Sequence, residues 1–389
     1  MYNFKKITAV LLSAVMLSGL TACGNTDASE ETGTPDTTAA DTSAAADDTP
    51  DDSADARVYA EGNKFMVNGK ELWINGVNTP WDKWNDFGST KFDPEFWDTH
   101  FAELAASGVN ASRVWINCSS MQGVRMKTTG EVKEVTEKHW QDVDKLFEIA
   151  EKHGIYIMAT MISFDHFKDS NGSYENWRNM ITTEEGTTSF VNDYIVPFVQ
   201  RYDDNDYLWS IDLCNEIDWV YENAECGKIG WEHICNYFAD ASAAIHENSD
   251  VLVTAGMGMI KYNSNDYQGN YLADDYLKSL GNENSYMDFY SPHYYFWQKT
   301  HMGYPFDVTP EEFKLENDRP CVIGETPADF SEIGKEVKEA YENSYSNGWN
   351  GVMAWTSNGV DNCGDLTHIA PATERMLELI PEKVRPLEN

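Results

Sequence analysis

Two short apolar segments of the chain each end on a glutamate, and two carboxylates delivered in this way can act together in acid–base or nucleophilic chemistry. Segment 208–213 continues through Asn215 to Glu216, and segment 321–324 is followed directly by Glu325. Chemistry with two carboxyl groups needs one protonated and one ionised, which different surroundings can provide. A single glutamate after a strand is more often a solvated loop residue, so the hypothesis depends on the fold bringing both strand ends together.

The elements that would position these glutamates alternate between apolar strands and amphipathic helices. The expected strands are continuous apolar runs typical of a parallel sheet buried on both faces. They are segments 72–77, 111–116, 155–161, 208–213, 251–255, 289–294, 321–324 and 351–355. Helices are predicted at 93–106, 137–153, 188–201, 229–247, 310–316 and 333–347. Asp93-Pro94 and Thr136 are start signals, and Gly108 and Gly154 are end signals.

This alternation predicts an α/β fold of the (β/α)8 TIM barrel type. An open doubly wound sheet would usually carry a glycine-rich phosphate turn after its first strand, and none is present there. A short hairpin over 58–67, with a turn at Asn68-Gly69, is expected to precede the barrel. In a barrel the C-terminal strand ends face one mouth, so Glu216 and Glu325 would be neighbours.

The other residues at the predicted C-terminal strand ends are also polar or aromatic. They are Asn78, Arg113, His166, Asn215, His293, Tyr295 and Trp355. Each alone has an ordinary structural explanation, such as an ion pair or a packed core histidine, but their shared position at one rim favours a functional site. Arg113 near Glu325 would keep that carboxylate anionic, whereas Glu216 in a drier place would hold its proton.

Tryptophans follow several of the predicted strands, where they could stack on the apolar faces of sugar rings. Trp81 and Trp84 follow the first strand, Trp219 the fourth and Trp297 the sixth, and Trp355 ends the eighth. Two carboxylates flanked by Arg, His, Tyr and such aromatics suit glycosidic bond cleavage through an oxocarbenium-like transition state. No Cys/His spacing of a zinc site is present, and neither a metal nor another cofactor is expected.

At these positions the sequence resembles the glycoside hydrolases of clan A, most closely family 5, which contains cellulases and β-mannanases. The resemblance covers 72–355. It implies Glu216 as general acid/base, Asn215 as a ligand of the sugar 2-OH, and Glu325 as nucleophile of a retaining reaction with a covalent glycosyl-enzyme intermediate. The carboxyl groups would then lie about 5 to 5.5 Å apart.

The resemblance also implies which residues bind the substrate. These are Arg113, His166, His293, Tyr295 and Trp355, with Asp165 as the alternative to His166 at the end of the third strand. The leading hypothesis is an endo-β-1,4-mannanase, and an endo-β-1,4-glucanase of the same fold is the nearest alternative. A transglycosylase would use the same residues. A non-catalytic polysaccharide-binding surface lipoprotein is less favoured, because a pure binder has no reason to retain both glutamates.

The first 56 residues predict export. Residues 1–23 combine Lys5 and Lys6, an apolar run and small residues before Cys23, which indicates a signal peptide rather than a membrane-spanning helix. The C-terminal part of this segment resembles the lipobox of bacterial lipoproteins, which implies a lipid on Cys23 and an extracellular protein anchored to the cell surface. Ordinary signal-peptide cleavage with a free Cys23 is the alternative. Residues 24–56 are acidic and rich in Thr, Ser, Ala and Asp, so a disordered tether is expected.

Composition bounds the remaining possibilities. Segment 57–389 has the length of a single barrel domain. A formal net charge of −37 argues against nucleic acid as a partner, and membrane contact is expected only through Cys23. A polysaccharide or oligosaccharide substrate and a monomeric state are expected. Beyond Cys23 there are six cysteines, an even number that permits disulfides without indicating their pairing.

Overall fold

The computed structural model describes residues 57–118 and 121–388 of the 389-residue chain. The predicted signal peptide, tether and lipidation residue Cys23 lie outside the described residues. Within these two ranges no helix combines the length and the apolar character needed to cross a membrane. The six described cysteines are all free thiols, and five of them are buried.

Seven parallel strands form a curled sheet in the order β10-β9-β8-β5-β4-β16-β15. Their bounds are β4 Ile74–Asn78, β5 Ala111–Trp115, β8 Tyr156–Thr160, β9 Leu208–Asp212, β10 Leu252–Thr254, β15 Val322–Pro327 and β16 Gly351–Trp355. Nearly every residue in these strands is buried, as expected for a sheet covered on both faces. Each strand overlaps a predicted one, although most bounds differ by one to three residues.

The ring closes through strand β14 (Ser291–Pro292), which lies between the two edge strands of the curled sheet. It pairs in parallel with β11 (Gly256–Met257), the continuation of β10, and isolated parallel bridges join Tyr290 to Cys321 and His293 to Glu325. The predicted strand 289–294 is therefore present, but its ladder is interrupted, because Pro292 has no N–H to donate. The (β/α)8 prediction is confirmed.

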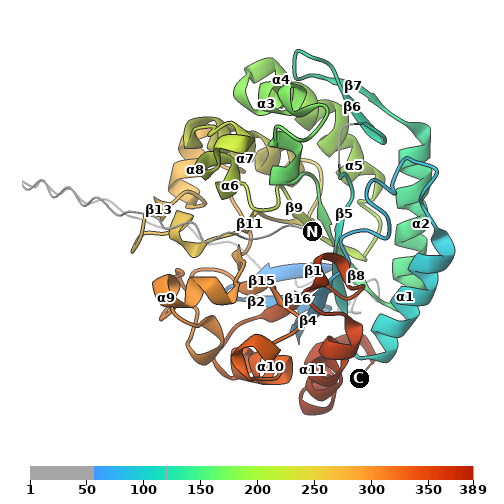
Figure 1. The fold of residues 1–389 in the computed structure, drawn as a ribbon, viewed down its shortest axis with the longest axis vertical. Coiled ribbons are helices and arrows are strands. Elements are labelled where there is room, and N and C mark those ends of the chain that lie inside the picture. Colours follow the sequence, from blue (N-terminus) through green and yellow to red (C-terminus); the bar gives the residue numbers. More distant parts are fainter. Residues whose placement is uncertain (1–56, 119–120, 389) are drawn as a thin grey trace, which may run out of the picture. The chain divides into compact units, whose positions relative to one another are not determined.

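Helices surround the strands (Figure 1). Those of six or more residues are α1 Pro94–Ala106, α2 Glu137–His153, α3 Tyr174–Thr182, α4 Glu184–Phe190, α5 Val196–Arg201, α7 Trp231–His246, α8 Asp274–Leu280, α10 Val337–Ser346 and α11 Leu366–Leu379. Shorter ones are α6 Asp218–Glu222, α9 Lys299–Met302 and α12 Pro381–Val384. Asp93 and Thr136 cap α1 and α2 as predicted, and Gly154 ends α2 with a φ of 68°.

The helix predicted at 310–316 is wrong. Thr309 and Glu312 do exchange backbone-to-side-chain hydrogen bonds like a capping box, but the segment forms only turns. Lys314 adopts a φ of 80°, which ends the helical path after a single turn. The predicted helix 188–201 is present but is divided by a π-helical turn, Val191–Ile195. The sequence did not predict α3, α8, α11 or the hairpin of β6 (Val124–Met126) and β7 (Val132–Val135).

The N-terminal segment forms a three-stranded antiparallel meander of β1 (Val58–Glu61), β2 (Lys64–Val67) and β3 (Lys70–Leu72). The predicted Asn68-Gly69 turn joins β2 to β3, with φ values of 49° and 71°. Phe65 of this meander packs edge-on against Trp209 and Phe289, which lie near the N-terminal ends of their strands. The meander therefore closes the bottom of the barrel and leaves the C-terminal ends of the strands as its mouth.

Candidate active site

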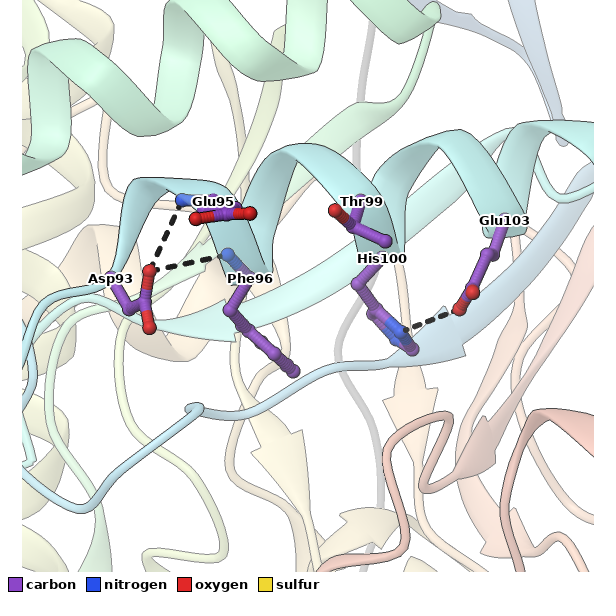
Figure 2. Close-up of a pocket in the computed structure, with 6 residues that line it drawn as sticks. All are labelled: Asp93, Glu95, Phe96, Thr99, His100 and Glu103. Carbon is purple, nitrogen blue, oxygen red and sulfur yellow. Dashed lines mark hydrogen bonds and ion pairs between the residues drawn. The ribbon is translucent and has the colours of Figure 1, made fainter.

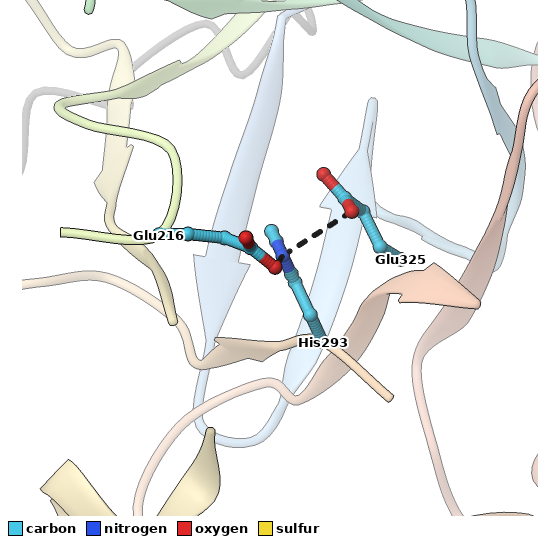
Figure 3. Close-up of side chains that lie close together, drawn as sticks. All are labelled: Glu216, His293 and Glu325. Carbon is cyan, nitrogen blue, oxygen red and sulfur yellow. Dashed lines mark hydrogen bonds and ion pairs between the residues drawn. The ribbon is translucent and has the colours of Figure 1, made fainter. Parts of the chain in front are cut away.

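Glu216, His293 and Glu325 converge at the mouth of the barrel (Figure 3). Glu216 follows β9, His293 follows β14 and Glu325 lies within β15. One carboxylate oxygen of each glutamate and a ring nitrogen of His293 all lie within 4.8 Å of one another. Carboxyl groups this close fit the separation of about 5 to 5.5 Å in retaining glycosidases, whereas inverting enzymes need about 6.5 to 9.5 Å to admit a water.

Glu325 is nearly inaccessible and accepts hydrogen bonds on both carboxylate oxygens. The Arg113 guanidinium donates to Oε1 at 2.5 Å, and the Tyr295 hydroxyl donates to Oε2 at 2.8 Å. Burial raises the pKa of the Glu325 carboxyl, while His293, Arg113 and the Tyr295 hydrogen bond oppose that rise. The predicted contact of Arg113 with Glu325 is present, and the charge that it brings works against desolvation.

Arg113 is fully buried and fixed by four acceptors. Its Nε and Nη2 atoms donate to Asp212 Oδ2 at 3.0 and 2.6 Å. It also donates to Asn78 at 3.1 Å and to Asn215 at 2.9 Å, in addition to Glu325. A guanidinium with this many charged and amide partners cannot rotate away without leaving buried groups unpaired. Arg113 therefore sets the position of both the Glu325 carboxylate and the Asn215 amide.

Glu216 has fewer compensating partners than Glu325. Its carboxylate Oε1 lies 3.0 Å from His293 Nδ1, and its backbone has a φ of 49°. Its N–H donates to the Gly256 carbonyl at 2.7 Å, which anchors this left-handed turn to the neighbouring strand. Burial raises the pKa of Glu216 to about 7, against the opposing charge of Arg113. At neutral pH this carboxyl can hold a proton, which is the state that a general acid needs.

His293 lies between the two glutamates. Its Nδ1 atom is 3.0 Å from Glu216 Oε1 and 3.4 Å from Glu325 Oε2. Burial lowers its pKa to about 4, so the ring is neutral near pH 7. Gly256 is required beside it, because a Cβ there would lie 2.7 Å from His293 Nε2 and 2.8 Å from the Arg113 guanidinium.

The three converging donor groups would also be close enough for a metal ion. However, the Arg113 guanidinium already contacts Glu325 directly, so the protein itself supplies the positive charge at this place. The donor set is therefore that of an acid–base site, and we assign it no metal.

Aromatic side chains near the C-terminal ends of the strands form two groups. In the first, Trp81 packs edge-on against Trp84 at 4.6 Å between ring centroids, and Trp355 packs against Trp81 and Trp115. In the second, Trp219 of α6 lies 6.4 Å from Trp297, whose residue surface is 53% exposed. Trp115 and Trp355 end their strands and are buried, whereas the other four lie in the segments that follow strands and are at least partly exposed, where sugar rings could reach them.

His166 is a correction to the predicted set of substrate-binding residues. Its side chain is fully buried, packs edge-on against Trp177, and bonds to Ser163 and Asn117. It cannot contact a sugar in this position. The alternative residue, Asp165, is partly exposed and forms an ion pair with Lys168 at 2.6 Å.

Asp212 is a site residue that the sequence analysis missed. It is fully buried in β9, and besides Arg113 its carboxylate accepts hydrogen bonds from Thr160 Oγ1 at 3.0 Å and the Gly256 N–H at 2.9 Å. An acidic residue inside an otherwise apolar strand was the available signal, because a buried carboxylate needs a cationic partner.

A shallow hollow of about 270 Å³ lies along α1 (Figure 2). None of the predicted site residues lines it. Its His100 side chain instead joins a buried chain of hydroxyls, with Nε2 2.8 Å from Ser357 Oγ, which in turn lies 2.7 Å from Thr79 Oγ1. This hollow is part of the helix packing rather than of the carboxylate site.

Known proteins similar to this chain are mannan-degrading enzymes by name. A mannan endo-1,4-beta-mannosidase from Cryptopygus antarcticus is 24% identical over 335 residues, which cover 79% of this chain and 86% of the relative. The beta-mannanase structure from the blue mussel Mytilus edulis has a TM-score of 0.73 at 19% identity, over 83% of this chain and 96% of that one.

A glycoside hydrolase family 5 mannosidase structure from Rhizomucor miehei has a TM-score of 0.56 at 14% identity, over 85% of this chain and all of that one. No family model matches the chain. The solved structures establish the barrel fold, and the name of the curated relative agrees with the β-mannanase part of the resemblance that the sequence predicted.

Proposed function

We propose that this chain is a retaining endo-β-1,4-mannanase in which Glu325 is the nucleophile and Glu216 the general acid/base. One observation carries the proposal. The two carboxyl groups meet at the mouth of the barrel in unequal surroundings, with Glu325 bonded to Arg113 and Tyr295, and Glu216 desolvated beside a neutral histidine.

The reaction would proceed in two displacements. In the first, Glu325 Oε2 or Oε1 attacks the anomeric carbon, the glycosidic C–O bond breaks, and the Glu216 proton passes to the departing oxygen. In the second, the Glu216 carboxylate takes a proton from water, whose oxygen attacks the same carbon and releases Glu325. The anomeric carbon is inverted twice, so its configuration is retained.

The residues around the pair have complementary roles. Tyr295 and Arg113 hold Glu325 with its carboxylate directed at one place, which reduces the reorganisation needed at the transition state. His293 Nδ1 shares a hydrogen bond of 3.0 Å with Glu216 Oε1 and so fixes the direction of the acid. Asn215, held by Arg113 and Ser163, lies next to Glu216 in the chain, where a sugar hydroxyl would need a partner.

Mannan is preferred over cellulose as the substrate because of the similar proteins. The curated relative and four of the similar structures are mannanases by name. A glucanase and a non-catalytic glycan-binding protein are therefore not favoured. The partly exposed tryptophans in the segments that follow the strands would suit several sugar rings of a long chain that is cut internally.

The test is reducing-sugar release from a panel of mannan, glucomannan, carboxymethylcellulose, xyloglucan and xylan. We expect release from mannan and glucomannan, with a rapid fall in viscosity that indicates internal cleavage, and none with Glu325→Gln. Release from carboxymethylcellulose alone would identify a glucanase. Binding to a polysaccharide without release from any would identify a glycan-binding protein.

We also propose that the protein is exported and anchored to the cell surface by a lipid on Cys23. The support is the pattern of residues 1–23 in the sequence. In a bacterial host, Cys23→Ser should move the protein from the membrane fraction to the soluble fraction without changing its turnover of mannan. Retention of the variant in the membrane fraction would contradict the anchor.

A further inference from the structure

Asp218 is a buried carboxyl group two residues after Glu216 to which the proposed mechanism assigns no role. It is the first residue of α6 and is fully inaccessible. Its Oδ1 atom accepts a hydrogen bond from the Gly258 N–H at 2.9 Å. Its Oδ2 atom is buried and has no hydrogen-bond partner among the described residues. A buried oxygen without a partner is costly for an ionised carboxylate and much less so for a protonated one.

Gly258, the partner of Asp218, lies directly against the acid. A Cβ at this position would be 3.2 Å from the Glu216 carboxyl carbon and 3.0 Å from Trp219 Nε1. Its carbonyl accepts a hydrogen bond from Gln298 Nε2 at 2.9 Å. Asp218 and Gln298 therefore hold Gly258 through its N–H and its carbonyl, and Gly258 forms one wall of the place where the Glu216 carboxyl lies.

We propose that Asp218 is a positioning residue for Glu216: its carboxyl binds the Gly258 N–H and thereby keeps Gly258 against the Glu216 carboxyl. The inference rests on the proposed role of Glu216 as general acid/base. Asp218 touches neither the sugar nor the bond that breaks, and it acts through Glu216 and Gly258.

The charges around the two carboxyl groups agree with this role. Burial raises the pKa of Asp218 to about 8, with Glu216 as the next cause and Glu222 as a further like charge. The groups that act on Glu216 are Arg113, Asp165, Trp219 and Lys168, with His293 in contact. Burial raises the pKa of Glu216 only to about 7, so Glu216 ionises before Asp218, and its charge helps Asp218 to keep the proton that its unpartnered Oδ2 favours.

The test compares Asp218→Asn with Asp218→Ala. Asparagine retains an acceptor for the Gly258 N–H but cannot ionise, whereas alanine removes both functions. The matched control is Asp142→Asn, since Asp142 of α2 is also buried and accepts a glycine N–H, from Gly88 at 2.8 Å, in addition to its ion pair with Lys138 at 2.7 Å. For each variant kcat and KM on mannohexaose are measured from pH 4 to 9, with circular dichroism as the check of folding.

We expect Asp218→Ala to lower kcat about tenfold, with KM changed less than about twofold, because a displaced acid affects the transition state more than binding. Asp218→Asn should recover most of this kcat, and the fall of kcat at alkaline pH should keep its midpoint, because Asp218 is uncharged while Glu216 ionises. Asp142→Asn should leave kcat unchanged. An Asp218→Asn variant that is no more active than Asp218→Ala, or an equal loss of kcat in Asp142→Asn, would overturn the proposal.

Infrared spectra separate this inference from the proposed function, because they need no turnover. The C=O stretch of protonated carboxyl groups is followed at pH 5, and the component lost in Glu216→Gln belongs to Glu216. This component should change frequency in Asp218→Ala, which releases Gly258 from Asp218, and stay in place in Asp218→Asn. If the protein fails to cleave mannan but this pattern is present, the function is wrong and the positioning role stands. If it cleaves mannan and the component is the same in both variants, the positioning role is wrong.

Discussion

The two ends of the barrel are built from the same strands but from opposite kinds of side chain. Strand β9 begins near Trp209, which packs on Phe65 and Phe289 at the bottom, and leads to Asp212 and then Glu216 at the mouth. The bottom buries aromatic surface, which stabilises the fold at no electrostatic cost. The mouth buries charges, whose desolvation roughly cancels their mutual attraction. The difference indicates that the bottom carries stability and the mouth carries chemistry.

The sharpest test of this division is to neutralise one carboxylate at the mouth. Glu325→Gln and Glu216→Gln should each lower kcat on mannan by about a thousandfold or more, because a nucleophile or an acid is lost. The melting temperature should stay the same or rise, since a buried charge is removed. Glu103→Gln, on the exposed face of α1, is the control. Full turnover in either site variant would remove that glutamate from the mechanism.

Arg113 lies at the mouth, but its replacement should lower both stability and activity. Replacement by methionine keeps much of the side-chain volume but leaves Asp212 and Glu325 as unpaired buried charges. We expect about 3–5 kcal/mol less free energy of unfolding, measured by urea denaturation, together with a large loss of kcat. The double variant with Asp212→Asn should regain part of the stability and none of the activity. A fully stable Arg113→Met protein would show that water or protonation compensates these carboxylates.

Truncation of Phe65 at the bottom should have the opposite signature. Phe65→Ala removes the ring that packs on Trp209 and Phe289, and should cost about 3–5 kcal/mol of unfolding free energy. At temperatures where the variant is folded, its kcat per folded molecule should match that of the unmodified protein. A lower kcat in the fully folded variant would show that packing at the bottom affects the catalytic residues at the mouth.

The smallest effect is that of pH, and it should be confined to the mouth. Because burial raises the pKa of Glu216 to about 7, kcat/KM should fall about tenfold per pH unit above that value. The same shift means that Glu216 favours the folded state most at pH below its unfolded pKa, and that this contribution is lost as the pH rises through about 7. Titration of kcat/KM in Glu216→Gln should lack the alkaline limb. If kcat/KM of Glu216→Gln still falls at alkaline pH, that fall comes from the titration of another group.

Much of the barrel fold and of the candidate site could be predicted from the sequence. Continuous apolar strands that stop on polar residues gave the barrel, its order and the meeting of Glu216, Glu325, Arg113, His293 and Tyr295, because barrel geometry brings all C-terminal strand ends to one place. Start signals such as Asp93-Pro94 worked because capping is a local interaction.

The residues that were missed depend on contacts that local patterns do not encode. Asp212 and Asp218 lie within or beside an apolar strand, and only the three-dimensional structure shows that one faces Arg113 and the other faces Gly258. His166 shares the strand-end position of the true site residues, but its ring turns inward onto Trp177. Segment 310–316 begins with a capping interaction at Thr309 but does not continue as a helix, since Lys314 ends the turn through its backbone conformation, which the sequence pattern does not reveal.

The meander at the bottom also fixes where the rest of the chain can be attached. Arg57, the first described residue, bonds to Ser249 and forms an ion pair with Asp203, in the loops that enter β10 and β9. Any segment joined ahead of it therefore starts at the end of the barrel remote from Glu216 and Glu325. An immobilising tag, a fused domain or a support placed there would leave the mouth open to polymers as long as mannan.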